Sequence, residues 1–320
     1  KTVSETLDIA RIEAGAFELE AAPFSPLALI EEVMAAYAAP AERKALQIYG
    51  LPDPAIPAVL VGDVTRIKQV LNNLMSNAIK FTDAGQVVLR SKLLSLESNM
   101  ATIVMQVEDS GRGIDQEPLA RIFEPFYQVE KNAWLKNGTG PGLSICRRFA
   151  QMMGGTIWAT SEPGNGTSFF LTVSLQVKND AAPPEAHALD GSEVYVYSDL
   201  RELSTNICVW LGKWDAQVHP FQVGSAEDDG AAILLEIPRS RLVADIAWSG
   251  PRIRVELSAL HAEHERNDGA QIIHAYSVRA IAEAVGRLQP YQDLVESIHI
   301  KPLAYSLNLK ILAVEDNPIN

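Results

Sequence analysis

Several kinds of residue are scarce in this 320-residue chain. It has only two cysteines, Cys146 and Cys208, and their spacing matches neither a disulfide framework nor a metal-ligand motif. No apolar run is long enough to span a bilayer, and no signal peptide opens the chain. Positive charge is also short, because 40 acidic residues outnumber 27 lysines and arginines. We therefore expect free thiols in a reducing compartment and no broad nucleic-acid-binding surface.

The length and the hydrophobic content of 47% are typical of a globular protein with two or more domains. The chain opens without methionine and stops just after a strand-like run, so we expect a fragment of a longer protein. Helical spacing predicts helices at 1–14, 26–45, 63–81 and around 141–153. Alternating patterns predict two hairpins, one from 86–97 and 101–109, the other from 156–161 and 167–175.

The pattern changes after the stretch KNDAAPPEAHALD at 178–190, which is typical of a linker. Beyond it, EVYVYS, AAILLEI, RIRVELS and AQIIHAYS are short apolar runs with helical or loop segments between them. This alternation predicts a small α/β domain with a mainly parallel sheet.

Polar residues form a stripe on the expected helix at 63–81. Gln69, Asn73, Asn77 and Lys80 are spaced by four, four and three residues and therefore share one face. An asparagine oxygen is suited to Mg²⁺, and a lysine supplies a point charge for phosphate. A solvated helix face without a ligand is the alternative.

Two glycine-rich stretches follow. In VEDSGRGID a strand ends in Asp109, a possible acceptor for an exocyclic amine, and Gly111 and Gly113 allow a sharp turn. The stretch GTGPGL at 138–143 opens a helix, whose N-terminus attracts phosphate. Taken singly, the first stretch is equally a plain Asp-Gly turn, and the second is weak support for nucleotide binding.

Phe123 and Phe126 flank Pro125 in the stretch IFEPFYQVE, between the two glycine-rich stretches. They are either core aromatics or the anchor of a mobile flap at 127–137.

These blocks occur in a fixed order within about a hundred residues, and in that order they resemble the catalytic ATP-binding domain of sensor histidine kinases. That superfamily includes gyrase and mismatch-repair ATPases, and its blocks are called N, G1, F, G2 and G3. The resemblance covers residues 1 to about 178 and implies an α/β sandwich that binds ATP and Mg²⁺.

The resemblance also assigns roles. Asn77 matches the Mg²⁺-coordinating asparagine, Asn73 the asparagine near the phosphates and Lys80 a phosphate-contacting residue. Asp109 matches the aspartate that binds the adenine amine, and Thr167 a threonine near the adenine. The remaining nucleotide-binding positions are Gly111, Gly113, Gly138, Gly140, Gly142 and Leu143. Pro141 replaces the family's leucine and removes one backbone donor from the loop.

The family's phosphoacceptor histidine is absent from the sequence. None of the six histidines has the expected His-Glu-x-Arg-Thr-Pro type context, and all follow the ATP-binding region. The opening LDIARIEAG resembles the end of the second helix of a dimerisation hairpin, so we expect the acceptor helix before Lys1.

The final stretch, LKILAVEDNPIN, resembles the first strand of a receiver domain. Glu315 and Asp316 match the acidic pair that holds the receiver's Mg²⁺. A kinase followed by a receiver implies a hybrid kinase in a phosphorelay, whose partners are its own hairpin histidine, its receiver, a histidine phosphotransfer protein and a response regulator. The resemblance further implies a full-length homodimer and the cytoplasmic portion of an inner-membrane sensor.

The middle region imitates a receiver. Glu236 stands where a receiver has its phosphorylatable aspartate, and Ser258 near the usual Thr/Ser. Only Asp199 follows the first strand, and Ser277 lacks the Lys-Pro that should follow. A divergent scaffold is the simpler interpretation. An α/β domain in this place resembles the Rcs-type hybrid kinases.

We therefore predict an α/β multi-domain chain. Its parts are a hairpin helix end (1–19), the ATP-binding domain (20–178), a linker (179–190), a receiver-like domain (191–290), a second linker (291–308) and a truncated receiver (309–320). Two other functions stay open: a nucleotide-binding regulatory module with little kinase activity, weakened by Pro141, and a superfamily ATPase that drives a clamp.

Overall fold

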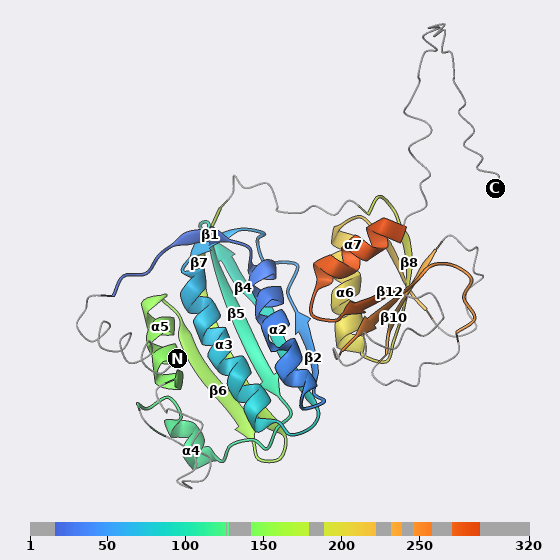
Figure 1. The fold of residues 1–320 in the computed structure, drawn as a ribbon. Helices are drawn as coiled ribbons and strands as arrows, with labels where there is room; N and C mark the ends of the chain where they lie inside the picture. Colours follow the sequence, from blue (N-terminus) through green and yellow to red (C-terminus); the bar gives the residue numbers. More distant parts are fainter. Residues whose placement is uncertain are drawn as a thin grey trace, which may run out of the picture. The chain divides into compact units, whose positions relative to one another are not determined.

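Two β-sheets organise the described part of the chain (Figure 1). The computed structural model describes residues 17–125, 127, 142–178, 189–221, 232–238, 246–257 and 271–288. The chain divides into two units, Lys1–Leu288 and Gln289–Asn320, and every described residue belongs to the first. The expected helix at 1–14, the flap predicted at 127–137 apart from Tyr127, and the receiver strand at 309–320 lie outside the described residues.

The first sheet has seven strands in the order β1-β3-β7-β5-β4-β2, with β6 paired to β7. Both predicted hairpins are confirmed, because β4 pairs antiparallel with β5, and β6 with β7. Three short strands escaped prediction, β1, β2 and β3. The bounds are β1 Ala22–Phe24, β2 Gln47–Leu51, β3 Leu60–Gly62, β4 Gln86–Glu97, β5 Met100–Asp109, β6 Thr156–Glu162 and β7 Gly166–Val177.

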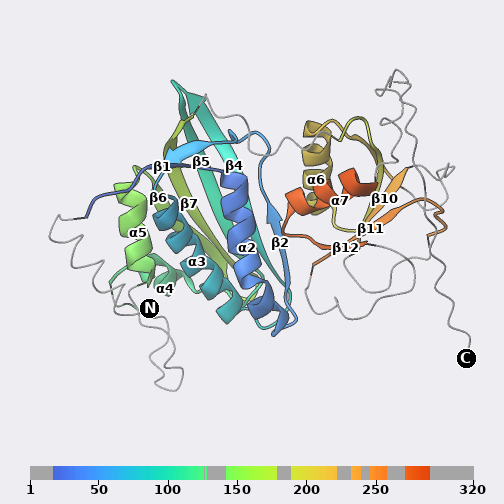
Figure 2. The same ribbon diagram turned by 45° about the horizontal axis from the view of Figure 1, so that its top comes forward.

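Helices α2, α3 and α5 cover one face of this sheet (Figures 1 and 2). The three predicted helices within the described residues are confirmed, with ends shifted by a few residues. Ser25 caps α2 by accepting from the backbone of Ala28, and Asp63 caps α3 by accepting from Arg66. The helices are α2 Pro26–Glu42, α3 Val64–Phe81, α4 Gln116–Arg121 and α5 Gly142–Met152.

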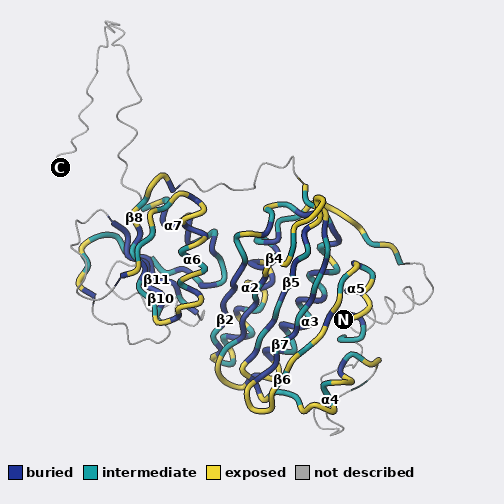
Figure 3. The backbone as a smooth tube through the Cα atoms, turned by 180° about the vertical axis from the view of Figure 1, so that it is seen from behind, coloured by how far each residue is buried: buried dark blue, intermediate teal, exposed yellow. Residues whose placement is uncertain are grey.

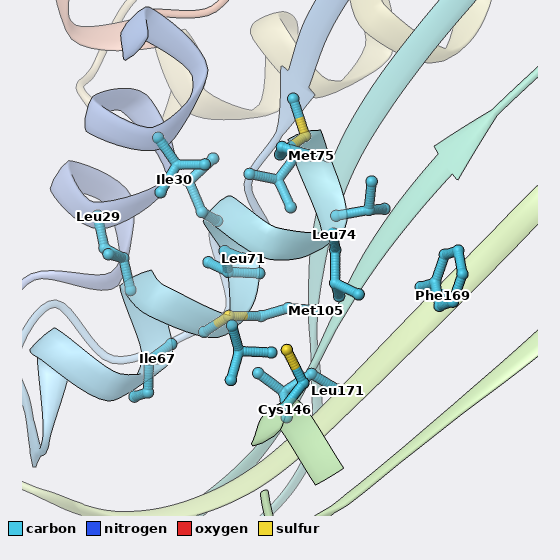
Figure 4. Close-up of a cluster of buried hydrophobic side chains, with 14 of the residues drawn as sticks. Leu29, Ile30, Ile67, Leu71, Leu74, Met75, Met105, Cys146, Phe169 and Leu171 are labelled. Atoms are coloured by element: carbon cyan, nitrogen blue, oxygen red, sulfur yellow. The ribbon is translucent and has the colours of Figure 1, made fainter. Parts of the chain in front are cut away.

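The apolar face of α3 forms the centre of the first core (Figure 4). Ile67, Leu71 and Leu74 are fully buried, at 0% exposure. They pack with side chains of α2, of α5 and of the sheet, such as Leu171. Because this face is fixed by packing, the polar face of α3 is held in one orientation.

The second sheet is entirely parallel, as predicted, with the order β9-β8-β10-β11-β12. This is the flavodoxin-like order 2-1-3-4-5 of doubly wound folds. Its elements are β8 Glu193–Ser198, α6 Arg201–Lys213, β9 Gln217–Pro220, β10 Ile233–Ile237, β11 Arg252–Glu256, β12 Gln271–His274 and α7 Val278–Leu288. Buried residues lie both in the strands of the two sheets and in the helices that pack on them (Figure 3).

Polar contacts join the two sheet systems along β2. Trp210 Nε1 and Asn206 Nδ2 on α6 donate to the carbonyl of Pro52 at 2.7 and 2.9 Å. Arg90 on β4 donates to both carboxylate oxygens of Glu202 at 2.8 Å. The Arg90 hydrogen bond lowers the pKa of the Glu202 carboxyl, although partial burial opposes this.

A buried carboxylate makes a second link between the sheet systems. Glu31 on α2 is 5% exposed and accepts hydrogen bonds from the side chain and backbone of Arg279 and from the Ser277 hydroxyl. Tyr49, Leu51 and Val88 of the first sheet share an apolar cluster with α6 and α7. The side of β2 that points away from α2, called here its outer side, is therefore covered by α6 and α7.

Replacing Leu71 with alanine should lower the free energy of unfolding by about 2–5 kcal/mol, because a fully buried side chain leaves a cavity. Leu94→Ala is the control, since Leu94 is 54% exposed and its loss should change stability by less than about 0.5 kcal/mol. Urea unfolding of both variants measures the difference. Equal destabilisation would contradict the central place of α3.

Candidate functional site

Asp109, at the end of β5, has an almost buried carboxyl group. It is 6% exposed, and the backbone N–H of Gly111 donates to its Oδ1 at 2.9 Å. Thr167, its partner across β5 and β7, is equally buried and also donates a backbone hydrogen bond. The predicted residues Asp109, Gly111 and Thr167 therefore lie together.

Burial raises the pKa of the Asp109 carboxyl above its ordinary value, because the carboxylate has lost water. Backbone hydrogen bonds from Gly111 and Thr167 act in the opposite direction, the nearby Glu108 charge adds to the rise, and the Thr82 hydroxyl again opposes it. The result is an enclosed acceptor with few competing waters, a suitable partner for a single amino group.

Sequence reasoning missed Thr82 and Ser161 beside this carboxyl. Thr82 is fully buried directly after α3, and its hydroxyl reaches both Asp109 and the carbonyl of Ala78. Ser161 Oγ donates to the carbonyl of Gly166 and lies 2.9 Å from Thr167 Oγ1. The sequence signal for Thr82 was a hydroxyl residue directly after the expected helix at 63–81.

The conformation of Gly166, the first residue of β7, requires a glycine. Its φ is +98°, and a Cβ there would lie 1.9 Å from the carbonyl oxygen of Asp109. Gly113 also has a positive φ, +71°, where the chain turns against the carbonyl of Glu162. The predicted G1 turn and the hairpin at 162–166 therefore pack directly on each other.

A second group of predicted residues meets farther along α3. Asn77 Nδ2 donates to Asn73 Oδ1 at 3.2 Å. Gly142, the first residue of α5, lies so close that a Cβ would come within 2.4 Å of Asn73 Nδ2. The next residue, Leu143, packs against the first core. A helix N-terminus therefore approaches the amide pair, as phosphate binding requires.

The orientation of the Asn77 amide is compatible with a metal ion. Its nitrogen is directed to Asn73, which leaves the carbonyl oxygen for another partner, and an amide oxygen is one of the ligands that Mg²⁺ accepts. Within the described residues no cluster of three or more His, Cys, Asp or Glu side chains is suited to a metal. A fit to Mg²⁺ thus depends on one protein oxygen, completed by phosphate oxygens and water.

A groove of about 620 Å³ continues from Asn73 between α2, α3 and α5. Its walls include Leu29 of α2, Gln69 of α3 and Phe149 of α5. Asp109 does not line it. The groove therefore belongs to the Asn73 end of the site.

Two positive charges flank an exposed ring between the two groups. Phe81 is 40% exposed, and Lys80 Nζ and Arg112 Cζ lie 4.9 and 5.1 Å from its ring centroid. Lys80 itself is exposed on the polar face of α3. These side chains supply positive charge to a chain whose net charge is −13.

Other predicted residues lie elsewhere. Phe123 packs edge-on against Phe169, 6.4 Å between ring centroids, which gives it a place in the core. Glu236 of β10 is fully buried, and Arg254 donates to it at 2.9 and 3.1 Å, with Arg252 at 3.5 Å. Outside the described residues lie Gly138, Gly140, Pro141, Phe126, Ser258, Glu315 and Asp316.

The family of this ATPase region is shown by comparison with known proteins. Residues 62–177 match the family described as histidine kinase-, DNA gyrase B- and HSP90-like ATPase. Sensor histidine kinase RcsC of Salmonella typhimurium is 30% identical over 338 residues, covering 100% of this chain and 33% of RcsC. The chain thus spans about a third of that relative's length.

Other relatives agree. Hybrid signal transduction histidine kinase B of Dictyostelium discoideum is 36% identical over 206 residues, covering 64% of this chain and 10% of the relative. Sensor protein TorS of Escherichia coli is 37% identical over 202 residues, covering 62% of this chain and 21% of TorS.

The fold also has a solved counterpart. A crystal structure of full-length ShkA in complex with AMPPNP matches with a TM-score of 0.68 at 24% identity, over 91% of this chain and 62% of that one. Of the described helices, none has the length and apolarity needed to cross a bilayer. From these matches we conclude that residues 62–177 form an ATPase domain of the histidine kinase-, DNA gyrase B- and HSP90-like family, and that the named relatives of the chain are sensor histidine kinases.

Proposed function

We propose that the chain is the ATP-binding catalytic core of a phosphorelay hybrid histidine kinase. It would direct the γ-phosphoryl group of ATP to a histidine on a dimerisation hairpin, from which a receiver aspartate takes it. The observation that carries this proposal is that the Asp109 cluster and the Asn73–Asn77–Gly142 contact both lie against α3. Asn77 and Thr82 are five residue steps apart, roughly 7–8 Å along the helix axis, a span that an extended nucleotide bridges.

The Asp109 cluster and the polar face of α3 have different tasks in this proposal. Asp109 accepts the amino group of adenine, and Thr167 and Gly111 hold the carboxyl in place. Asn73, Lys80 and the N-terminus of α5 orient the phosphates. Mg²⁺, held through the oxygen of Asn77, would neutralise phosphate charge.

The transfer itself requires little covalent chemistry from this domain. The γ-phosphorus forms a bond to an imidazole nitrogen as its bond to the bridging oxygen breaks, ADP leaves, and the imidazole loses its proton to solvent. Catalysis here is positioning and charge stabilisation. The groove beside Asn73 is the open side from which an acceptor would approach.

The wider partners belong to the same proposal. A hairpin histidine and a receiver of the same chain, a histidine phosphotransfer protein and a response regulator would form the relay, within a homodimeric, membrane-anchored sensor whose kinase core lies in the cytoplasm. The names of the relatives, sensor and hybrid kinases, support this general arrangement.

The region from β8 to α7 has a different task in our proposal: a degenerate receiver-like scaffold that does not accept phosphate. The parallel sheet with the order 2-1-3-4-5 supports a receiver origin. The carboxylate of Glu236, at the acceptor position, is fully buried and held by Arg254 and Arg252. Breaking such a pair would leave an uncompensated buried charge, which favours a fixed ion pair over a reactive acid.

Asn77→Ala should weaken binding of a non-hydrolysable ATP analogue about tenfold with Mg²⁺ present and much less without it, because the lost amide oxygen acts through the metal. Ser76→Ala, on the same helix, is the control. Titration calorimetry with and without Mg²⁺ measures the affinity of both variants.

A second experiment tests phosphoryl transfer. The chain fused to a dimerisation hairpin with its histidine should form acid-labile phosphohistidine from ATP, and the same fusion with Asn77→Ala should not.

The outcomes separate the two functions. Tight analogue binding without phosphohistidine would favour the nucleotide-binding regulatory module over the kinase. No detectable binding by the unchanged chain would contradict both.

Asp109→Asn should reduce ATP affinity at least about tenfold, because an amide is a weaker acceptor than a carboxylate. Asp115→Asn is the control: Asp115 is exposed and its side chain makes no cap hydrogen bond to α4. Since the pKa of Asp109 is raised, the affinity of the unchanged chain should fall, as pH drops, at a higher pH than for an ordinary aspartate.

The effect of Asp109 on the stability of the fold should have the opposite pH dependence to its effect on ATP affinity. A raised folded-state pKa means that protonated Asp109 favours the folded state below the unfolded pKa, and that this advantage is lost as pH rises through the folded pKa. Without nucleotide, Asp109→Asn should therefore melt at a higher temperature than the unchanged chain at neutral pH, and the gap should close as the pH falls to about 4, the unfolded-state pKa of aspartate. A gap that widens on acidification would contradict this assignment.

Glu236→Gln should lower the free energy of unfolding, measured by urea, by about 3–5 kcal/mol, because it leaves two arginine charges without their partner.

Treatment of the unchanged chain with acetyl phosphate should add no phosphoryl group to residues 193–288, as measured by intact mass and peptide mapping. Phosphorylation at Glu236 or Asp199 would disprove the scaffold assignment.

A further inference from the structure

Lys44 has an unusual set of partners outside the nucleotide site. It lies in the loop between α2 and β2, where Leu46 donates back to the carbonyl of Ala41 and Ala45 adopts a φ of +53°. From there its Nζ donates to the carbonyls of Ile79, Lys80 and Thr82 at 2.8, 3.0 and 2.9 Å. An ammonium group has three hydrogens, so this lysine is fully used.

The three carbonyls belong to the C-terminal end of α3. The last carbonyls of a helix have no partner within the helix, and together they form the negative pole of its dipole. A charge-assisted bond to each of them is stronger than a neutral one. Asp83 is also 3.8 Å from Lys44 Nζ, but its carboxylate is fully exposed and contributes little. Lys44 therefore fixes the last turn of α3.

That last turn forms one wall around Asp109. The Thr82 hydroxyl, which reaches the Asp109 carboxyl, belongs to the same residue whose carbonyl binds Lys44. The carbonyl of Phe81 lies against Gly111, since a Cβ on Gly111 would come within 2.5 Å of it. A displacement of this turn would therefore move the groups that set the direction of the carboxylate.

We propose that Lys44 is a positioning residue for base recognition: by holding the end of α3, it aligns Thr82 and Asp109 on the exocyclic amine of adenine. This inference rests on the proposed ATP site. It makes Lys44 a determinant of specificity although it touches no nucleotide. A lysine that served only as a helix cap would support the fold and leave base discrimination unchanged.

The test compares ATP with purine riboside 5′-triphosphate, which lacks the 6-amino group but keeps the rest of the ligand. In the unchanged chain ATP should bind more tightly. Lys44→Met should reduce the ratio of the two affinities about three- to tenfold, mainly by weakening ATP. Lys44→Arg, which keeps donors and charge, should restore most of the ratio.

Two further variants complete the experiment. Lys92→Met, the control, removes an exposed lysine of β4 away from the site, and should leave the ratio unchanged. Thr82→Val should lower the ratio with Lys44 intact, and the double variant Lys44→Met with Thr82→Val should be no worse than the stronger single one, because both act through one contact. If Lys44→Met does not fold, Lys44→Gln, which keeps hydrogen-bond donors but loses the charge, takes its place in the single and double variants.

Three results would overturn the inference. In the first, Lys44→Met lowers the melting temperature but weakens both triphosphates by the same factor, so Lys44 is a helix cap alone. In the second, the effects of Lys44 and Thr82 add independently. In the third, the unchanged chain has no preference for ATP, and then the assignment of Asp109 fails first and Lys44 with it.

Discussion

The packing of α3 is the constraint on which the rest of the structure depends. One face of this helix fills the core between α2, α5 and the sheet, so its opposite face has no freedom to rotate. The amides of Asn73 and Asn77 and the charge of Lys80 are presented by that second face. A polar site can be carried on a helix with precision because the apolar half of the same helix is closely packed.

Different physical effects determine the properties of the two ends of the site. At Asp109 the important quantity is dehydration: a carboxylate is kept with few waters and several donors, which makes it selective and costly to hold charged. At Asn73 and Gly142 it is close approach, which brings the N-terminus of α5 to the amides. Neither end forms from neighbouring residues in the sequence.

The sequence predicted the long elements for reasons visible in particular residues, since helical periodicity and turn signals defined α3 and both hairpins. The order of blocks selected Asp109, Asn77 and Gly142, which the fold places in two contact groups, and their roles in nucleotide binding stay predictions. Sequence reasoning missed Thr82, Ser161 and Lys44, because their roles depend on contacts across the fold: Lys44 binds carbonyls 35 to 38 residues away. Strands as short as β1 or β3 carry too few residues to show a period.

The covered outer side of β2 has a consequence for how the chain can be divided. The carbonyl of Pro52 accepts hydrogen bonds from Trp210 and Asn206 of α6, and the buried carboxylate of Glu31 accepts from Arg279 of α7. A chain that ended after β7 would lack these donors, would expose Tyr49 and Val88, and would leave the Glu31 charge without its partner. The ATPase domain and the elements from β8 to α7 therefore stabilise each other as one folding unit.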